Sequence, residues 1–482
     1  MHGTMLAGAS RLGISIPRLH GSFNGSVIAP GDPGYDQARA VFFGGFEALR
    51  PVAIIAPADT AEVARVVSLA RDSGLELAVR SGGHSSAGHG TADGGIVLDL
   101  ANLKGLEIDL RQRTAWAGAG LTAGEYTAAT GAHGLATGFG DTGSVGIGGI
   151  TLGGGIGYLV RKHGLTIDSL LAAEMVTADG SVLRLDAQSH PERFWAIRGG
   201  GGNFGVATRF RFRLHPLETI VGGMLLLPAT AEVIAGVIAE AEAAPEELSA
   251  IVNVMPAPPL PFLAREQVGE LVVMARMVYA GPAEAAQPVL DRFRALATPI
   301  ADTLQPMPYS GMFPPREGGF HPTAVAHTMF VDRVDHQVAA TILRHLEASD
   351  ALMRSAELRV LGGAMARVPV QATAFAHRHS RIMVNLAAFY DRPADRAARQ
   401  AWIDRFAAAL QQDDQGAYVN FLGDEGPARV RQAYPTPTWE RLAAIKRRWD
   451  PTNLFRRNHN IPPATTEMTV PSRRSRRGGT EA

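Results

Sequence analysis

The hexapeptide Arg-Ser-Gly-Gly-His-Ser at residues 80–85 has the residue types needed to bind a flat ligand and to bond to it. Gly82 and Gly83 have no Cβ atom, so this backbone can approach a ring or a pyrophosphate group closely. His84 follows directly, where its imidazole could form a bond to that ring. An ordinary tight turn that carries a polar histidine would contain the same residues. The hexapeptide alone therefore leaves both interpretations open, and a second motif has to decide between them.

Glycine is densest at residues 138–157, where it fills ten of twenty positions. We expect neither a stable helix nor a central strand from this composition, because glycine is destabilising inside both. Its uncovered backbone N–H groups can converge on an anion, and a diphosphate is the natural ligand. The apolar residues that interrupt the glycines favour a packed loop over a flexible linker: Val145, Ile147, Ile150, Leu152 and Ile156.

Two further glycine motifs do not indicate a nicotinamide-dinucleotide site. Residues 200–205 match the pattern G-x-G-x-x-G, and residues 118–123 match its weaker G-x-G-x-x-A form. The first should open a helix, but residues 208–214 alternate with period two and predict a strand. We therefore expect no Rossmann-type binding here.

Metal and hydrolase chemistry lack their motifs. The pairs His377/His379, which we expect on one strand face, and His321/His327 have no carboxylate at a matching interval, so we expect no metal site. The sequence contains no H-E-x-x-H motif and no G-x-S-x-G nucleophile elbow. It also contains no cysteine, which excludes thiolate nucleophiles, disulfides and cysteine-based metal sites.

The elements that position the hexapeptide are predicted by periodicity. Residues 52–57 and 75–79 predict strands, and residues 60–73 predict a helix that is capped by Asp59 or Thr60 and ends at Gly74. This β-α-β unit leads directly into the Gly-Gly-His loop. Further short strands are expected at 96–100, 114–119, 172–177, 182–185, 208–214, 269–279 and 382–390. The fold class is therefore α+β.

Composition sets broad limits on partners and location. The 482 residues are 46% hydrophobic and 19% charged, which is typical of two or three globular domains with a sizeable core. The formal net charge is zero, so we expect no nucleic-acid partner. No apolar run approaches the length of a membrane span, and residues 1–16 lack the pattern of a secretion signal. We expect a cytoplasmic protein without membrane attachment; its oligomeric state is left open.

The motifs, taken in order, resemble the berberine-bridge-enzyme-like FAD-linked oxidases of the vanillyl-alcohol-oxidase superfamily. The resemblance runs from about residue 25 to residue 463, through the blocks 80–84, 93–100, 138–157, 162–168, 194–205, 416–421 and 450–455. It implies a two-subdomain, PCMH-type FAD-binding domain at residues 20–215 and 416–465. It also implies a substrate domain at 216–415, with an antiparallel sheet flanked by helices, and we expect a flexible basic tail at 466–482.

The resemblance assigns FAD as cofactor and His84 as its covalent ligand. In such enzymes a neutral imidazole nitrogen attacks the methide tautomer of the flavin and bonds to its 8α carbon. Thr142 stands where many relatives have a cysteine that bonds to flavin C6, so we expect a single covalent bond. The remaining predicted FAD contacts are Arg80, Ser81, Gly82, Gly83, Ser85, Thr142, Gly143, Ser144, Val145, Gly146, Gly148, Gly149, Gly153, Gly157, Val206, Tyr418, Asn420 and Asn458.

The resemblance also assigns catalytic roles. Val145 matches a position where a small side chain admits O2 to the flavin, although it would suit plain core packing as well. Tyr418 matches the base and Asn420 its companion, both on one face of an expected strand. A free phenol titrates near pH 10, so Tyr418 needs a cation such as His377, Arg378 or His379, unless its role is only structural.

The predicted substrate contacts are Asn385, Arg378 and Tyr309. Residues 258–261 and 307–315 predict apolar loops over the site, which favours a medium-sized, partly apolar substrate. The predicted reaction is oxidation of an alcohol or amine carbon of a small molecule, a secondary metabolite, alkaloid or sugar, with O2 reduced to H2O2. An oxygenating or rearranging flavoenzyme and a non-catalytic FAD-binding protein remain alternatives.

Overall fold

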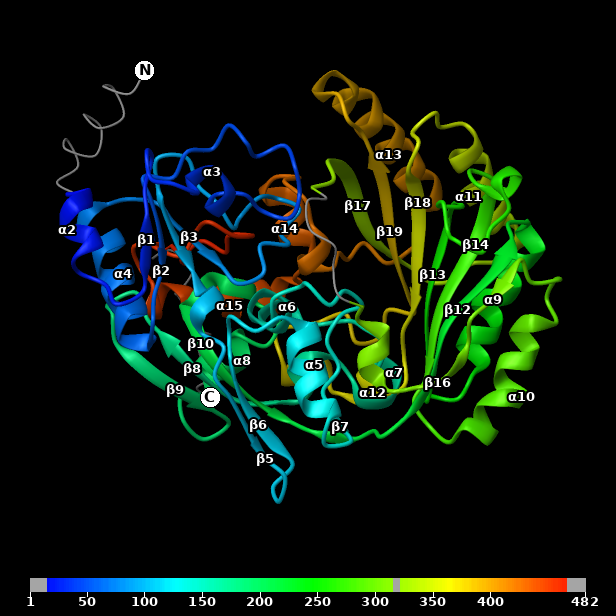
Figure 1. Cartoon of the computed structure of the whole chain (residues 1–482), viewed down its shortest axis with the longest axis horizontal. Coiled ribbons are helices and arrows are strands. Elements are labelled where there is room, and N and C mark those ends of the chain that lie inside the picture. The colour runs from blue at the N-terminus through cyan, green and yellow to red at the C-terminus, as the bar shows by residue number, and fades with distance from the viewer. Residues whose placement is uncertain (1–14, 315–320, 466–482) are drawn as a thin grey trace, which may run out of the picture.

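The computed structural model describes residues 15–314 and 321–465, and the protein has two halves that meet along one side of a large antiparallel sheet (Figure 1). The predictions for the N-terminal segment 1–14 and the basic tail 466–482 lie outside the described residues. Strands and helices are mixed throughout, and the fold class is α+β as predicted.

The first half begins with the predicted β-α-β unit. The strands β2 (Ala53–Ala56), β4 (Ile96–Asp99) and β3 (Leu77–Arg80) are parallel, and β1 (Ser26–Ile28) adds an antiparallel edge in the order β1-β2-β4-β3. The helix α4 (Thr60–Ser73) begins where the Asp59 carboxylate accepts the N–H of Glu62 at 2.8 Å. It ends at Gly74, whose φ of 68° is in the left-handed region that favours glycine. The sheet therefore delivers the end of β3 to the 80–85 loop.

A second, five-stranded sheet in this half has the order β5-β6-β10-β8-β9. Phe210 and Phe212 of β10 are fully buried, and Phe212 meets Tyr126 and Phe139 edge to face. These rings hold the start of the glycine segment against the sheet. The strands are β5 (Leu106–Asp109), β6 (Thr114–Gly118), β8 (Leu170–Val176), β9 (Val182–Asp186) and β10 (Val206–Arg213), and a small pair β7 (Leu135–Ala136) and β11 (His215–Pro216) lies beside them.

The second half is an antiparallel sheet whose main path is β15-β12-β14-β13-β18-β19-β17. Four helices pack on one face through a continuous apolar core (Figure 1). The strands are β12 (Ile220–Pro228), β13 (Leu248–Pro256), β14 (Leu271–Tyr279), β15 (Ala301–Asp302), β16 (Gln305–Met307), β17 (Ala324–Val331), β18 (Arg354–Val360) and β19 (Ile382–Phe389), and the helices are α9 (Ala231–Ala243), α10 (Ala283–Arg294), α11 (His336–Glu347) and α13 (Arg396–Leu410).

The other face of this sheet carries a polar row. Asn253, Glu357, Asn385 and Thr328 are opposite one another on β13, β18, β19 and β17, so their side chains project from the same face. The alternate residues on these strands, such as Leu358 and Val384, are buried under the helices. The polar row therefore belongs to the face that meets the first half of the molecule.

The chain returns to the first half after residue 416. Ala417, Val419, Leu442 and Phe455 are buried in the same apolar core as the first two sheets. The helices of this segment are α14 (Pro427–Gln432) and α15 (Thr436–Trp449). The exact domain division at residues 215 and 416 stays a prediction.

Three local predictions were wrong. Residues Ile147–Gly153 of the glycine segment form the short helix α6, because Ile147, Thr151 and Leu152 are buried and tertiary packing stabilises a helix that propensity alone would not. Tyr418 is not on a strand; it precedes a 3-10 turn, η8 (Val419–Phe421). His377 and His379 likewise lie in a connection before β19 rather than on one strand face.

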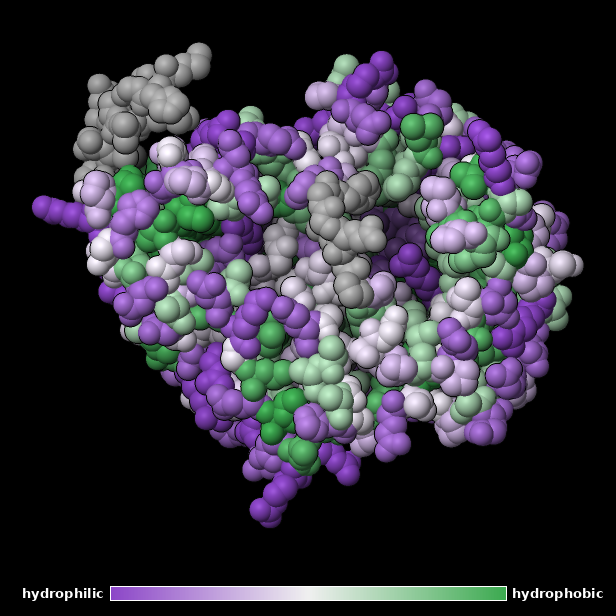
Figure 2. Space-filling view, viewed as in Figure 1, coloured by the Kyte–Doolittle hydropathy of each residue, from purple (hydrophilic) through white to green (hydrophobic). Residues whose placement is uncertain are grey.

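The surface and the helices bear on the question of membrane attachment. Hydrophilic and hydrophobic residues are interspersed on the face shown in Figure 2. Among the helices of residues 15–314 and 321–465, none has the length and apolar character to cross a bilayer.

The remaining short elements connect these sheets. They are α2 (Ile16–His20), α3 (Tyr35–Ala38), α5 (Ala123–Gly131), α7 (Val160–His163), α8 (Pro191–Ala196), α12 (Ala364–Arg367) and the 3-10 turns η1 (Leu100–Asn102), η2 (Thr166–Asp168), η3 (Gly201–Phe204), η4 (Arg265–Gln267), η5 (Tyr309–Met312), η6 (Val370–Ala372) and η7 (Pro393–Asp395).

Candidate active site

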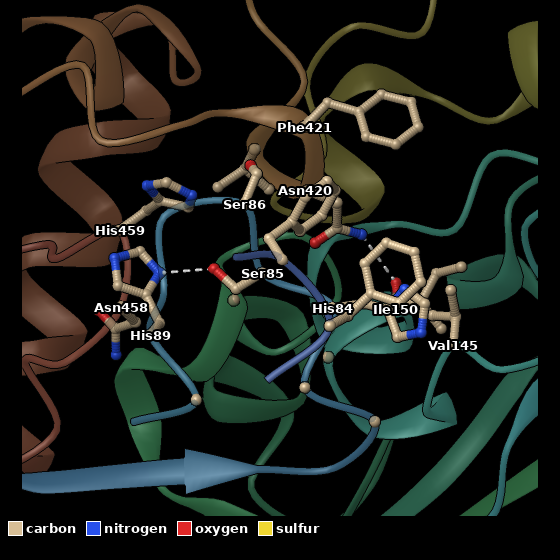
Figure 3. Close-up of a pocket in the computed structure, with 18 of the residues that line it drawn as sticks. His84, Ser85, Ser86, His89, Val145, Ile150, Asn420, Phe421, Asn458 and His459 are labelled. Atoms are coloured by element: carbon tan, nitrogen blue, oxygen red, sulfur yellow. Dashed lines mark hydrogen bonds between the residues drawn. The ribbon is translucent and has the colours of Figure 1, made fainter. Parts of the chain in front are cut away.

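A cavity of about 580 Å³ lies where the two halves meet, and segments from both line it. In Figure 3, His84 and Val145 lie at one end of it near Asn420, and His89, Asn458 and His459 gather at the other. The predicted cofactor residues that line the cavity are Arg80, Ser81, Gly82, Gly83, His84, Ser85, Thr142, Val145, Gly146, Gly148, Gly149, Val206, Tyr418, Asn420 and Asn458. The structure thus brings together the hexapeptide, the glycine segment and the C-terminal segment.

The hexapeptide and the glycine segment meet backbone to backbone. A Cβ atom added to Gly82 would overlap the backbone of Gly146, and one added to Gly146 would overlap Ser81. The Ser81 hydroxyl donates to the carbonyl of Ala119 at 2.6 Å and accepts the N–H of Gly148 at 3.3 Å. Glycine is therefore required at both positions for the two loops to touch.

The cavity wall offers unused polar groups that fit an anionic, polar cofactor. In the described part of the chain, the N–H groups of Gly82, Gly83 and Ser85 donate to no other residue, although all three residues line the cavity. Gly149 faces open space, with no atom near an added Cβ. The Asn458 Oδ1 is buried without a hydrogen-bond partner in the described residues. Such donors and acceptors fit the diphosphate and ribose of FAD.

His84 is held beside the loop that contains Val145. Its Nε2 lies 3.1 Å from the Oγ of Ser144, and its ring stacks on Phe42 with centroids 4.0 Å apart. Thr142 also lines the cavity, and its hydroxyl lies 3.3 Å from Asp141 Oδ1. Threonine offers no sulfur for a thioether, so Thr142 cannot form the bond that a cysteine at this position would form.

Tyr418 and Asn420 are adjacent even though they do not share a strand. The Tyr418 Oη accepts the N–H of Gly155 at 2.8 Å and an N–H of the Asn420 amide at 2.9 Å. Burial raises the pKa of Tyr418 above its ordinary value of 10.0, while these two donors and the charge of Arg359 act to lower it. Two donors therefore point at one phenol oxygen, an arrangement that favours the phenolate and opposes the effect of burial.

Arg359 on β18 is the cation that the sequence did not predict for this site. It lines the cavity and its guanidinium lies over the Phe421 ring, 4.9 Å from the centroid. It is buried, and it donates to Asp141 Oδ2 at 2.8 Å, Glu357 Oε1 at 2.8 Å and the carbonyl of Ile156 at 3.0 Å. Two carboxylates thus fix its head group beside Tyr418.

The cations that we predicted for Tyr418 lie elsewhere. Arg378 is fully buried and pairs with both oxygens of Asp168 at 2.7 and 2.8 Å, outside the cavity lining. His377 lies 2.8 Å from the carbonyl of Ala433, and burial lowers its pKa, so the ring is held neutral. His379 is exposed. Arg378 therefore lies outside the cavity lining, where Asp168 binds its guanidinium.

Other predicted contacts also lie outside the cavity lining. Tyr309 is buried against Phe313, and residues 258–261 and 307–313 do not roof the site as we expected. Gly143 packs against Phe313. Gly153 leaves room for the Asn420 amide, and Gly157 for the carbonyl of Phe139. These glycines shape the loop and do not line the cavity.

The predicted substrate residue Asn385 does line the cavity. Its Oδ1 is buried without a hydrogen-bond partner in the described residues, so it is an acceptor that a ligand can use. Other lining residues are small or apolar side chains of β17 and β19 and two polar side chains of α13: Ala324, Ala326, Ala387, Phe389, Arg396 and Gln400.

Besides Arg359, the sequence did not predict that three glycines of residues 200–205 and the histidines His89 and His459 line the cavity. Gly201, Gly202 and Gly205 line the cavity, although the motif at 200–205 opens no helix and is followed by β10. Burial lowers the pKa of His89 to about 3 and that of His459 to about 4, so both rings are neutral at neutral pH. The glycine motif was a signal for close backbone approach, whereas nothing in the local sequence marked the histidines.

Two family models match the segments that build the cavity. The model described as FAD binding domain matches residues 51–186, and the model described as berberine and berberine like matches residues 417–462. (R)-6-hydroxynicotine oxidase from Paenarthrobacter nicotinovorans is 30% identical over 457 residues, which are 92% of this chain and 97% of that protein. The chain belongs to the berberine-bridge-enzyme-like FAD-linked oxidases.

Solved structures agree with this family. The crystal structure of 6-hydroxy-D-nicotine oxidase from Arthrobacter nicotinovorans has a TM-score of 0.82 and 27% identity, and covers 92% of this chain and 99% of that one. Xylooligosaccharide oxidase from Myceliophthora thermophila, at 22% identity and a TM-score of 0.80, shares the fold over 94% of this chain and 100% of that one. The protein is an FAD-binding oxidoreductase of the vanillyl-alcohol-oxidase superfamily.

Proposed function

We propose that this oxidoreductase oxidises an alcohol or amine carbon of a medium-sized small molecule and uses O2 as the final electron acceptor, with release of H2O2. The observation that supports this most is the Tyr418 hydroxyl, which is buried in the cavity and accepts two hydrogen bonds. The relative named 6-hydroxynicotine oxidase supports a small-molecule substrate.

Bound FAD would accept a hydride from the substrate carbon, and Tyr418 would take the proton of its hydroxyl or amine group. The N–H of Gly155 and the amide of Asn420 then stabilise the negative charge on the Tyr418 oxygen before the proton arrives. The buried Oδ1 of Asn385 would accept an N–H or O–H of the substrate and orient the reacting carbon. The small side chain of Val145, near His84, would leave room for O2 to reach the flavin.

The experiment is a substrate screen of the holoenzyme with peroxide detection. A panel of cyclic amines, primary and secondary alcohols and sugars, including 6-hydroxynicotine and xylobiose, would be tested for anaerobic bleaching of the flavin. We expect one molecule of H2O2 for each molecule of substrate oxidised. Substrate consumption with a large peroxide deficit and oxygen in the product would instead show an oxygenase.

The His84 bond gives a prediction of its own. We expect FAD to stay with the wild-type polypeptide after acid denaturation and to be released from His84→Ala, because the family resemblance assigns the bond to this imidazole. The measurement is the mass and flavin absorbance of the denatured chain. His133→Ala, a change in the connection after α5 and outside the cavity lining, is the control and should keep its flavin. Free FAD from the wild type would disprove the bond.

The charge of Arg359 predicts the pH dependence of the reaction. Tyr418 accepts a proton only when it is deprotonated, so the rate of flavin reduction should rise as pH increases toward its raised pKa. Removing the charge in Arg359→Met raises that pKa further, so the rate profile should move to higher pH, while Arg359→Lys should move it less. Anaerobic stopped-flow reduction across pH measures the shift. An unchanged pH profile in Arg359→Met would show that Arg359 does not affect proton transfer to Tyr418.

A further inference from the structure

The imidazole of His84 is held on two sides by residues that the proposed reaction does not use. The Phe42 ring stacks on one face, with centroids 4.0 Å apart and planes inclined by 22°. The Ser144 hydroxyl lies 3.1 Å from Nε2. The backbone N–H of Phe42 donates to the carbonyl of Gly83 at 3.0 Å, so the main chain fixes the ring that covers His84. One face and one nitrogen of the imidazole are thus defined by the protein.

The position of Ser144 is fixed by backbone contacts on both sides. The N–H groups of Ala123 and Gly124, at the start of α5, donate to the carbonyls of Val145 and Gly143 at 2.8 and 2.9 Å. On the other side, Gly146 is packed so closely against Gly82 that neither could be any other residue. A serine between these anchors has little freedom except rotation of its hydroxyl, which it directs at His84.

This geometry has a chemical consequence for bond formation at His84. A neutral imidazole has one nitrogen with a lone pair and one with a proton, and the partner of either nitrogen selects the tautomer. If Ser144 Oγ accepts the Nε2 proton, the lone pair is on Nδ1. Attack by Nδ1 puts positive charge on the ring, and an acceptor at Nε2–H stabilises that charge, as the carboxylate of a catalytic triad does for its histidine.

We propose that Ser144 is the positioning residue for covalent attachment of FAD to His84, with Nδ1 as the bonding atom. This inference rests on the proposed function, because it presupposes the His84 bond. The bond joins Nδ1 to the 8α carbon in place of one methyl hydrogen. Bond formation releases one proton from Nε2 and one proton from the methyl group, and the electron pair of the broken C–H bond reduces the flavin. O2 then takes up these two electrons and two protons and leaves as H2O2.

The test measures attachment and not turnover. Protein expressed under riboflavin depletion would be mixed with FAD, and flavin fluorescence of the denatured chain would be followed over time. We expect Ser144→Ala and Ser144→Val to form the covalent bond roughly ten- to hundredfold more slowly, the range set by one hydrogen bond to a charged group. Ser144→Thr, which keeps the hydroxyl, should stay close to the wild-type rate. The affinity for FAD before the bond forms is measured in parallel, which separates a loss of attachment rate from a loss of binding.

A second serine–histidine pair provides the matched control. Ser169 lies 3.0 Å from Nε2 of His215, away from the cavity lining, so Ser169→Ala should attach FAD at the wild-type rate. Wild-type kinetics in Ser144→Val would overturn the role of Ser144 and leave the His84 bond intact. Loss of FAD affinity in Ser144→Val and Ser144→Thr alike would also overturn it, because Ser144 would then act in binding. Release of FAD from the denatured wild type would overturn the bond itself.

Discussion

Tyr418→Phe should slow anaerobic flavin reduction by roughly 10²–10⁴-fold, the usual contribution of a positioned general base. The substitution keeps the ring that packs edge to face with Phe375 and Phe421 and removes only the oxygen. The proton of the substrate then has no acceptor, and the donors at Gly155 and Asn420 lose theirs. Stopped-flow reduction by the substrate identified in the screen measures the loss, and the flavin spectrum before mixing shows that the cofactor is bound normally.

Tyr434→Phe is the matched control for this loss. Tyr434 is also buried, and its hydroxyl donates to the carbonyl of Gly199 at 3.1 Å, but it does not line the cavity. Tyr418→Phe loses two buried hydrogen bonds and Tyr434→Phe loses one, and each lost bond should cost about 1–3 kcal/mol of stability. Only Tyr418→Phe should lose rate. Reduction of Tyr418→Phe at close to the wild-type rate would leave Tyr418 with a packing role.

The parts of the fold that local sequence determines were predictable. The helix of residues 60–73 has a capping aspartate, an amphipathic period and a terminal glycine, and the structure has the same bounds. The prediction that the glycine segment forms no helix was wrong, because amino-acid composition does not account for tertiary packing. Its apolar residues contributed enough burial to form α6, which propensity alone does not allow.

Some residues of the candidate site could be predicted from the local sequence, and others could not. The loops around Gly82 and Gly146 were found because close backbone approach requires glycine, which is visible in the sequence. Arg359 was not found, because its place depends on the register of β18 in a sheet whose order no local pattern specifies. Arg378 looked equally suitable, but Asp168, 210 positions away in the chain, binds it in the fold.

A buried ion pair lies in the C-terminal segment that lines the cavity. The Nζ of Lys446 lies 2.7 Å from Asp450 Oδ2 and donates to the carbonyls of Asn203 and Phe455 at 2.8 Å each. The Asp450 carboxylate accepts the N–H groups of Leu454 and Phe455 at 2.8 and 2.9 Å. Because Asn203 and Phe455 line the cavity, this pair joins the glycine turn after α8 to the segment that follows α15.

Lys446→Met should therefore lower the free energy of unfolding by about 3–5 kcal/mol, because the Asp450 charge stays buried without its partner. Lys446→Met combined with Asp450→Asn should recover part of that loss, since no lone charge remains. Lys104→Met is the control: its pair with Glu125, at 2.6 Å, is nearly half exposed and should contribute under about 1 kcal/mol. Urea unfolding followed by tryptophan fluorescence measures all three. If Lys446→Met lowers the free energy of unfolding no more than Lys104→Met does, the buried pair does not hold the segment in place. In that case the affinity for FAD should be unchanged as well.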